Sequence, residues 1–204
     1  MLFYRTISYL FHPVLFSTIA SFLYFIITPS HIADENERII LAIVFVTTYI
    51  IPVLLVYFLK KFGLIDSYHL ATISERKFPV LFMTLLFFLL GKLLLDPGFI
   101  DLLAYSFFGC GIGLVMTYLL FPLKIKASLH TLSIAGLIAF VCIMSYHYQF
   151  NLLILILFLF ILFGLIGVSR LKLDAHKHLE VYIGFLIGFI SQLVAYRIFL
   201  FYQI

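Results

Sequence analysis

Long apolar runs separated by short polar connections constrain the fold of this chain more than any other feature. A helix needs about twenty consecutive apolar residues to cross the hydrocarbon core of a bilayer. Seven windows approach this length: residues 8–28, 38–59, 79–95, 99–121, 129–147, 150–168 and 180–202. Only 11% of the residues are charged, against roughly 25% in soluble domains. The sequence therefore predicts an all-α, polytopic transmembrane bundle of about seven spans, with six as the alternative, forming one domain over residues 1–204.

Local signals refine the ends and the packing of these spans. His12-Pro13 marks a helix start, because proline is tolerated in the first turn. Pro79 is expected to start the third span, and the Asp96-Pro97-Gly98 turn to tie that span tightly to the fourth. Gly184 and Gly188 have the small-xxx-small spacing that lets two helices approach closely.

The distribution of lysine and arginine predicts the orientation in the membrane. With seven spans, one side holds the N-terminus and the connections near residues 60–78, 122–128 and 169–179. Ten of the thirteen lysines and arginines lie on this side. Because cytoplasmic loops are enriched in these residues, the basic side is expected to face the cytoplasm. The same enrichment occurs in any membrane protein, so basic charge alone does not indicate a phosphate site.

Three polar segments on the basic side are the candidate functional regions: residues 66–79, 124–131 and 169–180. They follow the second, fourth and sixth spans. Since each is separated from the next by two crossings, all three emerge on the same side and can converge in one site.

The third segment combines a histidine, a carboxylate and an arginine. On a helix, His176 and Glu180 share one face at i and i+4, whereas His178 is directed away toward water or headgroups. A carboxylate that holds one ring nitrogen leaves the other available as a nucleophile or base. Arg170 can bind two phosphate oxygens through its planar fork. The alternative is a cytoplasmic helix start with surface ion pairs.

The other two segments offer further anion-binding groups. Ser128 stands at a helix N-cap position with His130 in the first turn, where free backbone N–H groups attract anions. Lys126 adds a charge just ahead of this helix, and Arg76 in the first segment supplies a second guanidinium. The alternative is that Ser128 is only a cap, His130 an interfacial residue, and the first segment a solvated loop.

Taken in order, the three segments resemble the phosphatidic acid phosphatase type 2 superfamily, which includes vanadium-dependent haloperoxidases. That family is marked by the blocks KxxxxxxRP, PSGH and SRxxxxxHxxxD. Ser169, Arg170 and His176 match the third block in register, with Glu180 in place of aspartate. Ser128-Leu129-His130 keeps the serine and histidine of the second block without its proline and glycine. In the first block, His69 takes the place of the lysine before Arg76, and the proline comes later, at Pro79. The chain is most similar to a compact bacterial membrane branch.

The resemblance implies a membrane-embedded lipid phosphate or diphosphate phosphatase. His176 would form a phosphohistidine, Glu180 would orient it, and His130 would act as general acid and base. The implied phosphate-binding residues are Arg170, Arg76, Lys126, Ser128, Ser169 and His69. No metal and no cofactor is required. The implied partners are the lipid bilayer and a lipid phosphate substrate, and the implied location is a bacterial inner membrane with the site facing the cytoplasm.

Several alternatives stay open at this stage. The departures from the blocks leave room for an inactive relative. A transporter or flippase for a phosphate-bearing lipid is the main rival, although such proteins place polar groups at the bilayer midplane. A metal site at Asp174, His176, His178 and Glu180 is disfavoured, because these residues do not share one helical face. A pure scaffold is also possible; no nucleic-acid partner is expected, and the sequence gives no indication of the oligomeric state.

Overall fold

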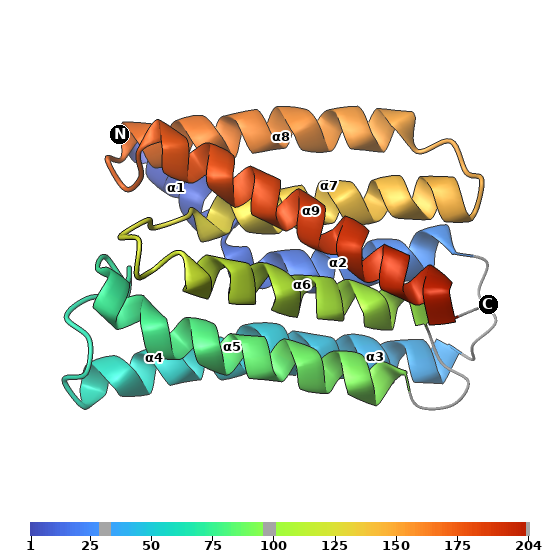
Figure 1. The fold of residues 1–204 in the computed structure, drawn as a ribbon, viewed down its shortest axis with the longest axis horizontal. Helices are drawn as coiled ribbons and strands as arrows, with labels where there is room; N and C mark the ends of the chain where they lie inside the picture. Colours follow the sequence, from blue (N-terminus) through green and yellow to red (C-terminus); the bar gives the residue numbers. More distant parts are fainter. Residues whose placement is uncertain (29–33, 96–100, 203–204) are drawn as a thin grey trace.

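The computed structural model describes residues 1–28, 34–95 and 101–202, and in this part the regular structure is helical throughout. The elements are α1 (Leu2–Leu10), α2 (Pro13–Ile27), α3 (Asp34–Phe45), the π-helical turn η1 (Val46–Ile50), α4 (Ile51–Lys61), α5 (Ile73–Leu94), α6 (Asp101–Leu119), α7 (Leu129–His147), α8 (Leu153–Lys172) and α9 (His178–Tyr202). Figure 1 shows them as an elongated bundle with the long helices side by side.

Six helices of the described chain are long and apolar enough to cross a membrane, or seven if the bent pair α1 and α2 counts as one span. This confirms the all-α polytopic bundle that the apolar runs predict. The protein is therefore a helical membrane protein. The predicted turn at Asp96-Pro97-Gly98 lies outside the described residues.

The first predicted span, residues 8–28, is wrong as a single straight helix. The structure has two helices there, α1 and α2, bent by 51° where they meet. His12 is extended, and Pro13 is the first residue of α2. A residue before proline is pushed out of the helical region, whereas proline itself suits the first helical position. His12-Pro13 is therefore a helix start, as predicted, and it also separates off a short helix that the sequence did not reveal.

The second span is one continuous helical run over Glu35–Lys61. Its π-helical turn η1 lies directly ahead of Pro52 in α4. A proline ring clashes with the carbonyl four residues earlier, here Thr48 inside η1. A wider π turn relieves this conflict, and so the proline does not break the span.

The third span starts earlier than predicted: α5 begins at Ile73 and contains Pro79 within the helix. A capping box fixes the start. The Thr72 hydroxyl accepts from the Glu75 backbone N–H at 3.3 Å, and the Glu75 carboxylate accepts from the Thr72 N–H at 2.9 Å. These bonds satisfy two N–H groups that a helix end otherwise leaves free. Arg76 consequently lies on a helix, buried in the protein, instead of in a solvated loop.

Helices α7 and α9 pack closely through the predicted small-residue pair. A Cβ added to Gly184 would lie 2.6 Å from the Ser128 carbonyl oxygen, and one added to Gly188 would lie 2.9 Å from the Leu132 carbonyl carbon. Only glycine permits this approach. Residues on α7 fill the centre of the core, with Ile134, Ile138, Val141 and Met144 fully buried.

The connections α4–α5, α6–α7 and α8–α9 all lie at the same end of the bundle, together with α1 (Figure 1). The three polar segments therefore meet at one end, as their positions after alternate spans predict. This end holds the candidate site.

Candidate functional site

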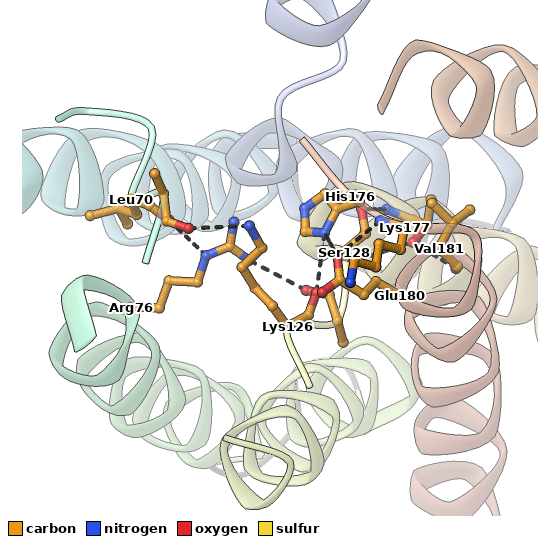
Figure 2. A network of polar contacts seen from close by, with 11 residues as sticks. Leu70, Arg76, Lys126, Ser128, His176, Lys177, Glu180 and Val181 are labelled. Atoms are coloured by element: carbon orange, nitrogen blue, oxygen red, sulfur yellow. Dashed lines mark hydrogen bonds and ion pairs between the residues drawn. The ribbon is translucent and has the colours of Figure 1, made fainter. Parts of the chain in front are cut away.

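His176 is held from one side, so that its two ring nitrogens have different states (Figure 2). Its Nδ1 atom lies 2.9 Å from Glu180 Oε2 and 3.1 Å from the Lys126 backbone oxygen. Both partners only accept hydrogen bonds, because one is a carboxylate and the other a carbonyl. Nδ1 therefore carries the hydrogen, and Nε2 carries the lone pair. Within the described chain, no hydrogen-bond partner is found for Nε2.

The His176–Glu180 contact is real, but the predicted reason for it is wrong. His176 precedes α9, which begins at His178, so the two residues do not share a helical face. Glu180 lies in the first turn of α9 and its Oε2 accepts from the Lys177 backbone N–H at 3.1 Å. A carboxylate is favoured at this end of a helix. Capping thus places the carboxylate, and His176 packs against it from outside the helix. His178 is exposed, as predicted.

His176 is a buried, neutral imidazole at neutral pH. Burial lowers its pKa first, and Arg76 lowers it further, while the hydrogen bond to Glu180 raises it. The result is a pKa of about 4, against an ordinary value of 6.5. The Nε2 lone pair is therefore free of a proton under physiological conditions, which is the state that a nucleophile requires.

Arg76 brings a buried guanidinium to the same place. Its side chain donates from Nε to the Leu70 oxygen at 2.8 Å and from Nη1 to the Ala127 oxygen at 3.4 Å. Both acceptors are uncharged carbonyls, and the residue is only 7% exposed. A buried charge without an opposite charge in direct contact is costly. Arg76 is thus a strong candidate for pairing with an anion.

Lys126 adds a second cation from the α6–α7 connection. Its ammonium group donates to the Ala71 oxygen at 3.1 Å, which ties this connection to the one before α5. Burial lowers the pKa of Lys126, and so does the nearby Arg76. Figure 2 shows Lys126 between Arg76 and the His176–Glu180 pair.

Arg170 and His130 meet on the inner side of α1. Arg170 donates from Nη1 to the Ser8 hydroxyl, while its Nε is buried and has no partner among the described residues. His130 Nε2 lies 3.2 Å from the Ser8 backbone oxygen and 3.4 Å from its hydroxyl. The His12 ring stands edge-to-face on the His130 ring, with centroids 5.5 Å apart.

The site therefore has two halves. One contains His176, Glu180, Lys126 and Arg76; the other contains Arg170, His130 and Ser8. Arg170 interacts electrostatically with both histidines, His130 and His176, and so links the halves. The two histidines make no direct hydrogen bond with each other.

Three sequence-predicted residues lie at the margins of the cluster. The Ser169 hydroxyl donates to the Tyr4 oxygen at 2.7 Å and holds α1 against α8. The Ser128 hydroxyl accepts from the Thr131 N–H at 3.5 Å, which confirms the predicted cap, and both serines are fully buried. His69 is exposed, with its ring 6.4 Å from that of Tyr9. These contacts organise the helices around the cluster.

Sequence reasoning missed Ser8 and His12 as parts of the site. The signal for them was present but weak: two polar residues four positions apart on the basic side, at the start of the first apolar window, residues 8–28. Without knowledge of the bend between α1 and α2, their direction could not be inferred.

The charges in the cluster are unbalanced in favour of cations. Arg76, Arg170 and Lys126 are set against two carboxylates: Glu180 inside the cluster, and Glu75 at the start of α5, which interacts electrostatically with Arg76. Among the described residues, no group of three or more metal-ligating side chains comes together. What the arrangement offers is a neutral, oriented histidine beside an excess of positive charge. No family model, no curated protein and no solved structure matches this chain.

Proposed function

We propose that this membrane protein is a lipid phosphate or diphosphate phosphatase that works through a phosphohistidine. One observation supports the proposal above the others: the Nδ1 atom of His176 is occupied by Glu180 and the Lys126 carbonyl, so that its Nε2 lone pair is available beside two guanidinium groups. The resemblance to the phosphatidic acid phosphatase type 2 superfamily points to the same residues.

In the proposed reaction, Nε2 of His176 attacks phosphorus and forms an N–P bond while the P–O bond to the lipid breaks. In this step His130 must start with a proton on both ring nitrogens; it gives one to the departing alkoxide and becomes neutral. It then takes a proton from water, which attacks the phosphohistidine and releases inorganic phosphate and the free imidazole. Glu180 stabilises the positive ring that exists during the covalent stage.

The cations act on the phosphoryl oxygens. Arg76, Arg170 and Lys126 are placed to neutralise negative charge that spreads over these oxygens in the transition state. Because Arg170 Nε is buried without a partner among the described residues, the N–H groups of its Nε–Nη2 edge can donate to two phosphoryl oxygens at once. No step in this scheme passes through a metal or a cofactor.

The location of the cluster suits a lipid substrate. The cluster lies at one end of the bundle, where a headgroup can enter while the tail stays in the bilayer. From the basic residues at this end, the site would face the cytoplasm of a bacterial inner membrane. Phosphatidate, phosphatidylglycerophosphate and polyprenyl diphosphates are the candidate substrates.

The test is phosphate release by the purified protein, reconstituted in lipid nanodiscs, from these candidate substrates. His176→Ala should abolish release, whereas His178→Ala should leave it unchanged. The second variant is a matched control, because His178 is exposed and only two residues away. Equal activity of the two variants, or no release by the wild type from any candidate, would refute the proposal.

The non-enzyme rival makes a different prediction in the same preparation. A flippase would move a phosphate-bearing lipid across a vesicle membrane and leave its phosphate attached. That result with intact His176 would replace the phosphatase by a transporter.

A further inference from the structure

Helix α1 contacts two of the residues to which the proposed function assigns chemistry or phosphate binding, Arg170 and His130, and also Ser169, the neighbour of Arg170. Ser169 donates to the Tyr4 oxygen, Arg170 donates to the Ser8 hydroxyl, and the His130 ring lies at hydrogen-bond distance from the Ser8 oxygen. All three contacts join α1 to another helix. They bring the start of the chain to α7 and α8 at the cationic end of the bundle.

Ser8 makes two of these contacts with different atoms. Its hydroxyl accepts from Arg170, and its backbone carbonyl faces His130. The residue lies in the last turn of α1, where the carbonyls have no partner within the helix. It is 8% exposed, although its neighbours Tyr9 and Leu10 are exposed. Ser8 is thus the one buried residue among those described in α1, and its hydroxyl and its carbonyl both contact residues of the site.

The hydroxyl contact decides which edge of Arg170 is available. A guanidinium presents two forks, and a carboxylate or phosphate binds best when both N–H groups of one fork are free. Ser8 occupies Nη1, and Nε remains buried without a partner. The edge formed by Nε and Nη2 is therefore the one left for an anion.

The carbonyl contact decides the state of His130. The Ser8 carbonyl oxygen, which only accepts, lies 3.2 Å from Nε2 and is nearer than the Ser8 hydroxyl at 3.4 Å, which can donate or accept, so we assign a hydrogen to Nε2. Nδ1 of His130 then holds the lone pair and is the atom that exchanges a proton.

We propose that Ser8 is a positioning residue of the phosphate site, which orients Arg170 through its hydroxyl and sets the tautomer of His130 through its carbonyl. Helix α1, which carries Ser8, thus adds a fourth segment to the three polar ones around the site. This assignment rests on the proposed function for its role in turnover, but its effect on anion binding is separate.

Three variants of α1 test the hydroxyl. Ser8→Ala removes the acceptor for Arg170, Ser8→Thr keeps it, and Thr6→Ala is the control, because Thr6 is exposed and bonds only to the Leu2 oxygen of its own helix. The probe is inorganic phosphate, whose binding is measured by the rise in unfolding temperature with phosphate concentration. Ser8→Ala should weaken phosphate binding roughly tenfold, as expected for a lost hydrogen bond to a charged group. Ser8→Thr and Thr6→Ala should stay close to the wild type.

Turnover and nitrogen NMR give two further readouts. If the phosphatase proposal holds, Ser8→Ala should raise KM by a similar factor and change kcat little, because the carbonyl that faces His130 is retained. Nitrogen NMR of histidine-labelled protein, with the His130 signal assigned by His130→Gln, should show the Nε2–H tautomer of His130 in both wild type and Ser8→Ala.

The outcomes separate the two proposals. Phosphate binding that weakens in Ser8→Ala, in a protein that hydrolyses no lipid phosphate, would support the positioning role and refute the phosphatase. Hydrolysis with Ser8→Ala indistinguishable from Thr6→Ala, or an Nδ1–H tautomer at His130, would overturn the positioning role alone. A wild type that neither binds phosphate nor hydrolyses would overturn both. If Ser8→Ala does not fold, the tautomer in the wild type still decides.

Discussion

Substituting Gly188 by alanine should separate α7 from α9 and destabilise the protein. The added Cβ would lie 2.9 Å from the carbonyl carbon and 3.0 Å from the Cα atom of Leu132, and closer still to the Leu132 oxygen. Ordinary contact begins at 3.4 Å. All three obstacles are backbone atoms, which cannot rotate away as a side chain would, so the helices themselves must move.

The size of the effect follows from two opposing terms. Overpacking a tight contact costs about 1–3 kcal/mol, and a backbone obstacle places this site at the upper end. Alanine gains about 0.8–1 kcal/mol over glycine from helix propensity. The expected net loss is about 2 kcal/mol of unfolding free energy.

Gly164→Ala is the matched control, because nothing lies within 4 Å of a Cβ at that position in α8. It should gain about 0.5–1 kcal/mol from the helix propensity of alanine. Denaturant unfolding in detergent micelles should therefore separate the two variants by roughly 3 kcal/mol. Equal stability of Gly188→Ala and Gly164→Ala would refute the close approach of α7 and α9.

The same substitution should also disturb the site. Where α7 and α9 begin, the Ser128 N–H donates to the Glu180 backbone oxygen at 3.0 Å, and the Thr131 hydroxyl donates to the Val181 oxygen at 3.0 Å. Separating the helices would lengthen these bonds and displace the Glu180 carboxylate from His176. If the phosphatase proposal holds, Gly188→Ala should lose activity at temperatures where it is still folded, and Gly164→Ala should not.

Three further predictions concern charge, pH and orientation. Glu180→Gln keeps the shape of the side chain but removes the charge that stabilises a positive His176 ring, so phosphate release should fall by about a hundredfold or more; an unchanged kcat would exclude the orienting role. The pKa of His176 is about 4 in the folded protein, against an ordinary 6.5, and so the unfolded chain takes up the proton first as the pH falls. The stability that comes from this difference is fully present above about pH 6.5 and is lost progressively between about pH 6.5 and 4. The free energy of unfolding of the wild type should therefore fall more steeply over this pH range than that of His176→Gln. Parallel curves of unfolding free energy against pH would contradict the lowered pKa. The orientation can be tested with single cysteines introduced into a chain without Cys110 and Cys142. A membrane-impermeant thiol reagent should label cysteines that replace Lys61 and Lys172 from the cytoplasmic side, and one that replaces Arg38 from the other side. The reverse labelling pattern would invert the orientation.

The fold was largely predictable because each long helix needs one apolar run that can cross a bilayer. The failures came where a short polar signal competed with hydropathy. At His12-Pro13, proline made a break inside an apolar run that hydropathy treats as continuous. At Thr72, the capping box with Glu75 starts α5 inside the polar segment 66–79, ahead of the start at Pro79 that hydropathy predicts. Both signals are local and can be recognised in the sequence, but hydropathy alone does not detect them.

The grouping of the candidate residues at one end was predictable, whereas most of their hydrogen bonds were not. Counting spans correctly placed three polar segments at one end, and Arg76, Lys126 and the His176–Glu180 pair do come together there. The Ser128 cap was predicted, but the bond from its backbone N–H to the Glu180 oxygen and the bond from Ser169 to the Tyr4 oxygen could not be inferred, because each depends on a neighbouring helix. The same holds for Ser8, which reaches the site only through the bend that follows α1.

Side chains, and not helix dipoles, supply the excess of positive charge at this end of the bundle, because helix N-termini and C-termini occur there together. Helices α2, α5, α7 and α9 begin there and α4, α6 and α8 end there, while the short helix α1 lies there with both of its ends (Figure 1). Positive N-terminal dipoles are thus offset by negative C-terminal ones. Three cations remain against the carboxylates of Glu180 and Glu75. Since Arg76 has only carbonyl oxygens as hydrogen-bond partners, the protein compensates its buried charge poorly. An oxyanion between Arg76 and Arg170 would supply the missing charge, and the neutral His176 would then lie beside it.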